Sequence, residues 1–180
     1  SGKLEIRLEA AFKRYYTRED VPMIFFSPTE GQLSLEELMQ TLANYVLEQP
    51  EAKYKLIIGT DSQTTAQSTH FVTAIVAHRV GKGGRFFIRH QHQRPMFSLR
   101  QKLIHETALS LETITKVQAE LLAHDLLFNY DLEVHVDAGH RGATRELIRD
   151  LVGLVITSGF TAKVKPDSFA ASSVADRFTR

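Results

Sequence analysis

Two hydrophobic segments of the chain each end in an aspartate. Asp61 follows the apolar run at residues 56–60, and Asp137 follows the alternating segment at residues 132–136. A carboxylate at the end of a buried strand is costly to desolvate unless its charge is compensated. Mg²⁺ and Mn²⁺ prefer carboxylate and water oxygens, so the two aspartates predict a divalent-metal site. One such aspartate is usually a turn cap, and the presence of two favours a site.

The residue directly after each aspartate has a short side chain, Ser62 in one case and Ala138 in the other. Ser62 and Gln63 come directly after Asp61, and residues 138–139 are Ala and Gly after Asp137. The ends of neighbouring strands in an α/β sheet are where ligands usually bind. We therefore expect the substrate backbone to approach here and to contact Ser62 and Gln63.

A long helix predicted at residues 98–124 offers a third carboxylate. At 3.6 residues per turn its sheet-facing stripe is Leu103, Thr107, Ser110, Ile114, Val117 and Leu121. Glu106 lies at the edge of this stripe, whereas Glu112 falls on the opposite side. Glu106 is therefore the expected metal ligand. The alternative is a border glutamate that pairs with Lys102 or Lys116 on the helix surface.

The C-terminal stretch offers a fourth carboxylate. Asp167 leaves a predicted strand, as Asp61 and Asp137 do, and this favours it as the ligand. Its ordinary role would be to cap the helix that follows, which is the usual role of an aspartate before a helix. Asp176, inside that helix, is the alternative ligand and equally suits a surface ion pair.

The pattern of apolar residues predicts an α/β protein. Five strands form a mixed sheet flanked by helices, with residues 1–50 as an N-terminal helical extension and 51–180 as the main domain. A helix at the very start of the chain can pack on the domain or form a dimer contact. The predicted helices are 3–18, 34–48, 98–124, 142–158 and 168–179, and the predicted strands are 53–62, 70–80, 85–94, 132–137 and 160–165.

Composition excludes several classes of protein. The 180-residue chain has no cysteine, so it has no disulfide, cysteine-based zinc site or thiol nucleophile. No apolar run approaches the roughly 18–20 residues that span a bilayer, and no signal peptide is evident. We therefore expect a cytoplasmic protein that is not embedded in a membrane.

The net charge of +1 restricts any nucleic-acid surface to a local patch. Residues 79–100 contain five arginines, one lysine and no acid, and they suit such a patch or a solvated hairpin face equally well. His90 and His92 would share one strand face, but no third ligand follows at the spacing of a zinc site.

Four segments resemble one protein family. IIGTDSQ, VDAGHRGATREL and KPDSFAASSVADRFTR are similar to motifs of the RNase H-like family of YkuK-type bacterial proteins, and FFSPTEGQLSLEEL resembles its N-terminal segment. The resemblance runs from Phe25 to Arg180 and implies an RNase H fold. It implies Asp61 as the first-strand ligand, Asp137 as the fourth-strand ligand and Glu106 as the helix glutamate.

The last motif also resembles the end of the type 2 RNase H pattern, which supports Asp167. Alignment to type 1 enzymes, whose last aspartate lies within the final helix, favours Asp176 instead. The chain departs from type 2 enzymes at Ser62, where they carry a glutamate.

What the resemblance implies is a nuclease that hydrolyses RNA, RNA–DNA hybrid or structured nucleic acid with two Mg²⁺ or Mn²⁺ ions about 3.5–4 Å apart. Asp61 would bridge both ions, Glu106 and Asp137 would hold one, and Asp167 the other. His140, Arg141 and Arg145 are expected to contact a phosphate near a helix start, or His140 to protonate the leaving group. His140 suits an exposed loop equally well. The alternative is a non-catalytic module of the same fold that binds nucleic acid or a protein.

Overall fold

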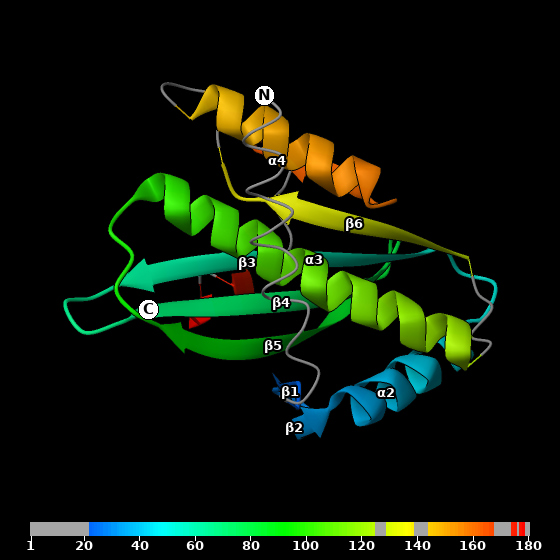
Figure 1. Cartoon of the computed structure of the whole chain (residues 1–180). Coiled ribbons are helices and arrows are strands. Elements are labelled where there is room, and N and C mark those ends of the chain that lie inside the picture. Colours follow the sequence, from blue (N-terminus) through cyan, green and yellow to red (C-terminus); the bar gives the residue numbers. More distant parts are fainter. Residues whose placement is uncertain (1–21, 125–128, 139–143, 168–173, 176, 179–180) are drawn as a thin grey trace.

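Seven strands form one mixed sheet in the computed structural model, which describes residues 22–124, 129–138, 144–167, 174–175 and 177–178 (Figure 1). The order across the sheet is β2-β1-β5-β4-β3-β6-β7. The strands are β1 (Ile24–Ser27), β2 (Gly31–Ser34), β3 (Tyr54–Thr64), β4 (Thr69–Arg79), β5 (Gly84–Gln93), β6 (Tyr130–Val136) and β7 (Thr161–Val164).

Antiparallel and parallel pairing divide the sheet. β3, β4 and β5 form an antiparallel meander, whereas β6 pairs with β3 and β7 with β6 in parallel. Parallel neighbours need a crossover connection, and the helices of this fold supply it. The carboxyl ends of β3, β6 and β7 therefore lie at the same end of the sheet.

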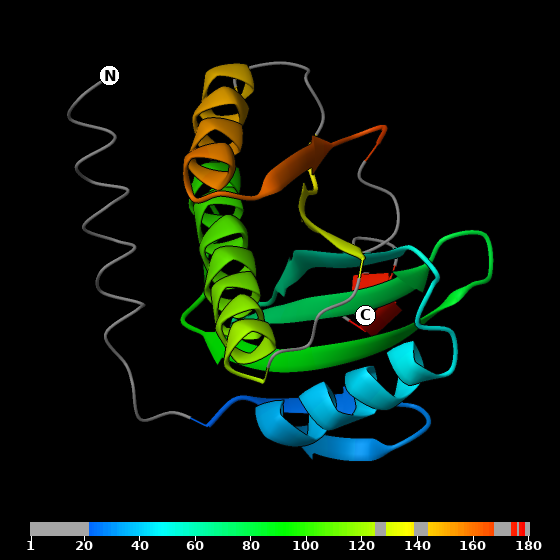
Figure 2. The same ribbon diagram turned by 90° about the vertical axis from the view of Figure 1, so that its right-hand side faces the viewer.

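Within the described ranges, the helices that pack with the sheet include α2 (Leu35–Leu47), α3 (Leu99–Ala123) and α4 (Arg145–Thr157). α3 crosses one face of the sheet, with α4 beside it and α2 near the β1–β2 end (Figure 2). The predicted capping box of α2 is confirmed, because Glu37 N donates to Ser34 Oγ and Ser34 N donates to Glu37 Oε2.

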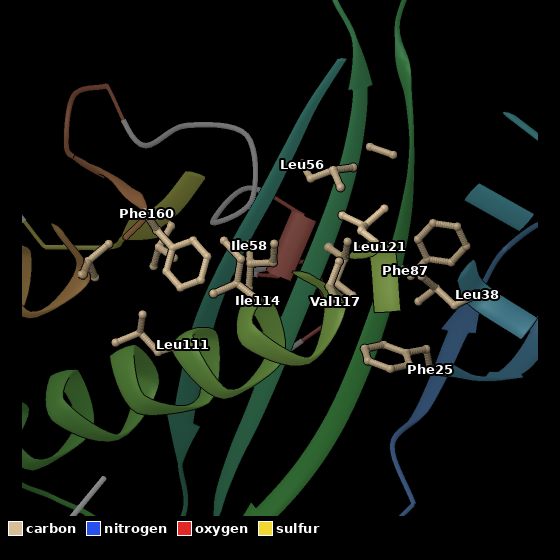
Figure 3. Packing of buried hydrophobic residues seen from close by; sticks show 14 of the residues in the cluster. Phe25, Leu38, Leu56, Ile58, Phe87, Leu111, Ile114, Val117, Leu121 and Phe160 are labelled. Atoms are coloured by element: carbon tan, nitrogen blue, oxygen red, sulfur yellow. The ribbon is translucent and has the colours of Figure 1, made fainter. Parts of the chain in front are cut away.

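The main hydrophobic core lies between α3 and the sheet (Figure 3). Ile58 from β3 and Ile114 from α3 have no exposed surface. A smaller cluster lies on the opposite face, where Ala175 and its neighbours cover Val72 and Ile88. The sheet is thus covered on both sides, which explains why its central strands are so apolar.

The sheet has two strands more than the sequence predicted. The predicted N-terminal extension contained helices at 3–18 and 34–48 and no strand, yet β1 and β2 form a hairpin between them that joins the sheet by pairing Phe26 with Ile88. Phe25 and Leu33 alternate with exposed neighbours, and Gly31 takes the positive φ of 77° that the tight turn needs. Such short strands carry little periodicity, so the helical prediction was wrong there.

The other predicted strands and helices are confirmed within the described residues, with small shifts at their ends. The predicted helix 3–18 and most of the predicted helix 168–179 lie outside the part that the structure describes. None of the helices in the described part is both long and apolar enough to span a membrane.

Candidate functional site

Asp61 and Asp137 lie at neighbouring positions on adjacent strands. In the parallel pairing of β3 with β6, the register reaches Gly59 opposite His135. Each aspartate is two residues further along its own chain. Because the two strands run parallel in this register, the two aspartates lie at the same end of the sheet. Adjacent strands are about 4.7–4.9 Å apart. Asp137 directly follows β6, as predicted, whereas β3 continues past Asp61 to Thr64, so Asp61 lies within its strand and not at its end.

Glu106 approaches the same place from α3. Its side chain is 9% exposed, and Ser62 Oγ donates a hydrogen bond of 2.5 Å to its Oε1. The pKa of Glu106 is raised to about 8, chiefly by burial and to a lesser extent by the charges of Asp61 and Asp137, against the opposing effects of Ser62 and Lys102. These three carboxylates therefore form one electrostatic group. Glu106 is a buried group and not the surface glutamate that was the alternative.

A lysine compensates one charge of this group. Val136 of β6 pairs with Val164 of β7, and the next residue on each strand is Asp137 or Lys165. Lys165 Nζ lies 2.6 Å from Asp137 Oδ1, while 16% of the aspartate side chain is exposed. Nothing in the sequence pattern pointed to Lys165 as a partner of Asp137.

The remaining predicted residues are less closely tied to this group. Asp167 is exposed in the turn after β7, where its backbone N–H donates to Val164 O. Gln63 is exposed on β3, and Arg145 is exposed at the first position of α4. His140, Arg141 and Asp176 lie outside the described residues. Within the described ranges, no three histidine or acidic side chains already surround one point as metal ligands would.

The composition of the group nevertheless suits a hard divalent cation. Its donors are carboxylate oxygens, which Mg²⁺ and Mn²⁺ prefer over nitrogen or sulfur. Asp61 and Asp137 both disfavour ionisation of the buried Glu106. A cation bound among the three carboxylates would remove that repulsion. Lys165 compensates the negative charge only at Asp137.

A second ionic pair lies under the same helix. Glu112, which the helical wheel placed on the solvent side, is 9% exposed, and its Oε2 lies 3.4 Å from Nη1 of Arg89 on β5. Ser110 binds Thr60 on β3, so opposite sides of α3 contact different strands. The wheel assumed a flat sheet that touches one stripe, whereas the twisted sheet wraps more of the helix. The solvent-side prediction for Glu112 was wrong.

The charges of the basic segment 79–100 are largely compensated by residues from other parts of the chain. Arg79 is buried, with Nη2 2.6 Å from Tyr45 O and 3.0 Å from Glu48 Oε2. Arg85 pairs with Glu30, and Arg89 with Glu112. Only the end of the segment keeps exposed arginines, at positions 94 and 100. The segment is therefore not a continuous basic face.

Comparison with known proteins agrees with this architecture. The profile of the family described as ribonuclease H-like matches residues 37–180. The uncharacterized protein YkuK of Bacillus subtilis (strain 168) is 40% identical over 167 residues, which cover 87% of this chain and 97% of that protein. No solved structure matches the chain significantly. The matches extend over most of the chain, including the strands that carry Asp61 and Asp137, and the chain belongs to the ribonuclease H-like family.

Proposed function

We propose that this protein is a Mg²⁺- or Mn²⁺-dependent nuclease that hydrolyses phosphodiester bonds of RNA, RNA–DNA hybrid or structured nucleic acid. The observation that supports the proposal is the electrostatic coupling of three carboxylates at one end of the sheet. Asp61 and Asp137 occupy matching positions on β3 and β6, and both raise the pKa of the buried Glu106. Membership of the ribonuclease H-like family supports a role that involves nucleic acid.

Each residue has a distinct part in this proposal. Asp61, Glu106 and Asp137 would hold the metal, with Asp167 as a further ligand from the turn after β7. The bound metal would activate water and stabilise the leaving oxygen. Ser62 fixes the position of the Glu106 carboxylate through its hydrogen bond. Gln63 and Arg145, both exposed, would contact the substrate together with His140 and Arg141.

Metal binding is tested by thermal unfolding with and without Mn²⁺. A cation that binds only the folded state raises the midpoint of unfolding. We expect Mn²⁺ to stabilise the protein and Asp61→Asn to abolish the shift. Asp131→Asn is the matched control, because Asp131 pairs with Lys53 at the exposed start of β6. An equal shift in all three proteins would exclude this carboxylate group as the site.

Catalysis is tested with labelled RNA, DNA and hybrid substrates. We expect cleavage that depends on Mg²⁺ or Mn²⁺ and that Asp137→Asn removes, while Asp131→Asn retains it. Cleavage that survives Asp137→Asn, or that EDTA leaves unchanged, would indicate a contaminating enzyme or another site.

A non-catalytic module that binds nucleic acid or a protein is the second candidate. The ion pair of Lys165 with Asp137 favours it, because the chain itself neutralises one of the three carboxylates. Metal stabilisation without cleavage of any substrate, combined with oligonucleotide binding that Asp137→Asn leaves intact, would select this candidate.

A further inference from the structure

Three histidines lie side by side on the face of the sheet opposite α3, at the end where β4 begins and β5 ends. His70 of β4 pairs in register with His92 of β5, and His90 lies two residues earlier on the same face. The His70 ring lies 4.5 Å from the His92 ring and 5.1 Å from the His90 ring, centroid to centroid. His70 Nε2 and His90 Nδ1 are 2.9 Å apart. His90 and His92 are exposed, and His70 is half-buried.

This cluster supplies the ligand that the sequence lacked. His90 and His92 alone cannot complete a zinc-like site, and no third residue follows at a suitable spacing. Antiparallel pairing places His70 directly across from His92, although 22 positions separate them in the numbering. Sequence spacing describes only ligands on one segment, so a ligand from the neighbouring strand was not visible to it.

The distances suit a shared metal ion. Two nitrogens bound to one tetrahedral Zn²⁺ at about 2.0–2.1 Å stand roughly 3.3 Å apart, by the geometry of the tetrahedron. His70 Nε2 and His90 Nδ1 share a hydrogen bond of 2.9 Å, so a bound ion would replace that bond and the two nitrogens would move slightly apart. The ring of His92 lies stacked on His70, so it must turn about its side-chain bonds to point a nitrogen at the ion. Water can fill a remaining position, because His90 and His92 are open to solvent.

The cluster is distinct from the carboxylate group. Across the sheet, Asp61 is in register with Val72, and Val72 with His90, so a fully buried valine stands between the two. The donors also differ, since imidazole nitrogens suit Zn²⁺, Cu²⁺ and Ni²⁺, whereas carboxylates suit Mg²⁺ and Mn²⁺. The two groups should therefore discriminate between metals.

We propose that His70, His90 and His92 form a binding site for a transition-metal ion of the Zn²⁺, Cu²⁺ and Ni²⁺ class, which joins β4 to β5. The site does not depend on the proposed nuclease function. A bound ion ties together two strands at the end of the sheet where β4 begins and β5 ends, and it stabilises that end.

Isothermal titration of the full chain with Zn²⁺ tests this proposal. We expect one Zn²⁺ per chain at this site, and a separate titration with Ni²⁺ should give the same result. His70→Ala, His90→Ala and His92→Ala should each weaken binding by at least about tenfold, since loss of even an outer-shell partner costs about 10- to 100-fold. His78→Ala is the matched control, because His78 lies at the other end of β4. Asp61→Asn should leave Zn²⁺ binding unchanged.

Three results would overturn the proposal. They are no measurable Zn²⁺ binding, equal binding by the three single variants and the wild type, or loss of binding in Asp61→Asn. If only His92→Ala retained full affinity, the three-ligand site would be wrong. Circular dichroism checks that each variant folds. If His90→Ala does not fold, His90→Gln is used in its place.

Discussion

Ser62 Oγ lies 2.5 Å from Glu106 Oε1, and this hydrogen bond ties the end of β3 to α3 beside Asp61. The serine stands at the position where type 2 RNase H enzymes carry a glutamate. Its hydroxyl holds the buried carboxylate in one orientation, and a charged side chain there would add to the repulsion that Asp61 and Asp137 already exert on Glu106. The departure from the type 2 pattern therefore leaves a group of carboxylates in which Glu106 has a hydrogen-bond donor.

Loss of this hydroxyl should weaken both folding and metal binding. Ser62→Ala removes a hydrogen bond to a largely buried carboxyl, which should lower the free energy of unfolding by about 1–2 kcal/mol. Without the bond the Glu106 carboxyl is less fixed, so the affinity for Mn²⁺ should fall as well. Urea unfolding and Mn²⁺ titration measure the two effects. Gln63→Ala, at the exposed neighbouring position, should change neither free energy appreciably.

Removal of Lys165 should strengthen metal binding. Its ammonium occupies the side of Asp137 on which a cation would also be attracted, and the two cations compete. Lys165 is 57% exposed, so solvent screens the pair, and Lys165→Met should raise the Mn²⁺ affinity by up to about fivefold. Lys53→Met, at another exposed pair, is the control in the same titration. A lower affinity in Lys165→Met would mean that the lysine assists the site and does not compete with it.

Removal of either partner of the Arg89–Glu112 pair alone should strongly destabilise the protein. Both side chains are about nine-tenths buried, so one left without the other keeps a charge in the core. Arg89→Met and Glu112→Gln should each lower the free energy of unfolding by about 3–5 kcal/mol. In a double-mutant cycle measured by urea unfolding, the double variant should lose much less stability than the two single variants added together. Additive losses would show that the pair is not coupled.

The stability of the protein should fall in weak acid because of His105. Burial lowers the pKa of His105 to about 4, below the value near 6.5 of the unfolded chain. The unfolded state therefore takes up the proton first, and stability is lost as pH falls from about 6.5 to 4, by about 3 kcal/mol in total. His105→Leu should flatten this part of the pH profile in urea unfolding. His124→Leu, at the exposed end of α3, should leave it unchanged.

The sequence was sufficient to predict the elements whose patterns are long. β3 and β6 are apolar or alternating over many residues, so Asp61 and Asp137 could be selected beside them before any pairing was known. The polar residues after Asp61 hid the continuation of β3 to Thr64. Glu106 could be selected because its neighbours Thr107 and Ser110 lie on the stripe that faces the sheet, and both are buried.

The features that the sequence did not predict depend on contacts between distant segments. The β1–β2 hairpin has four residues in each strand, which is too short for a clear period. The burial of Glu112 depends on the twist of the sheet, and the partnership of Lys165 with Asp137 depends on the register of β7. The pairing of His70 with His92 likewise exists only once β4 and β5 are aligned.

Anomalous X-ray scattering from a crystal soaked in Mn²⁺ tests the central claim most directly. The proposed site predicts a manganese peak between the carboxylates of Asp61 and Asp137, within coordination distance of both, with Lys165 Nζ displaced from Asp137. No peak at that end of the sheet in a crystal soaked at saturating Mn²⁺, with the Lys165–Asp137 ion pair intact, would contradict the proposed metal site and the nuclease function that depends on it.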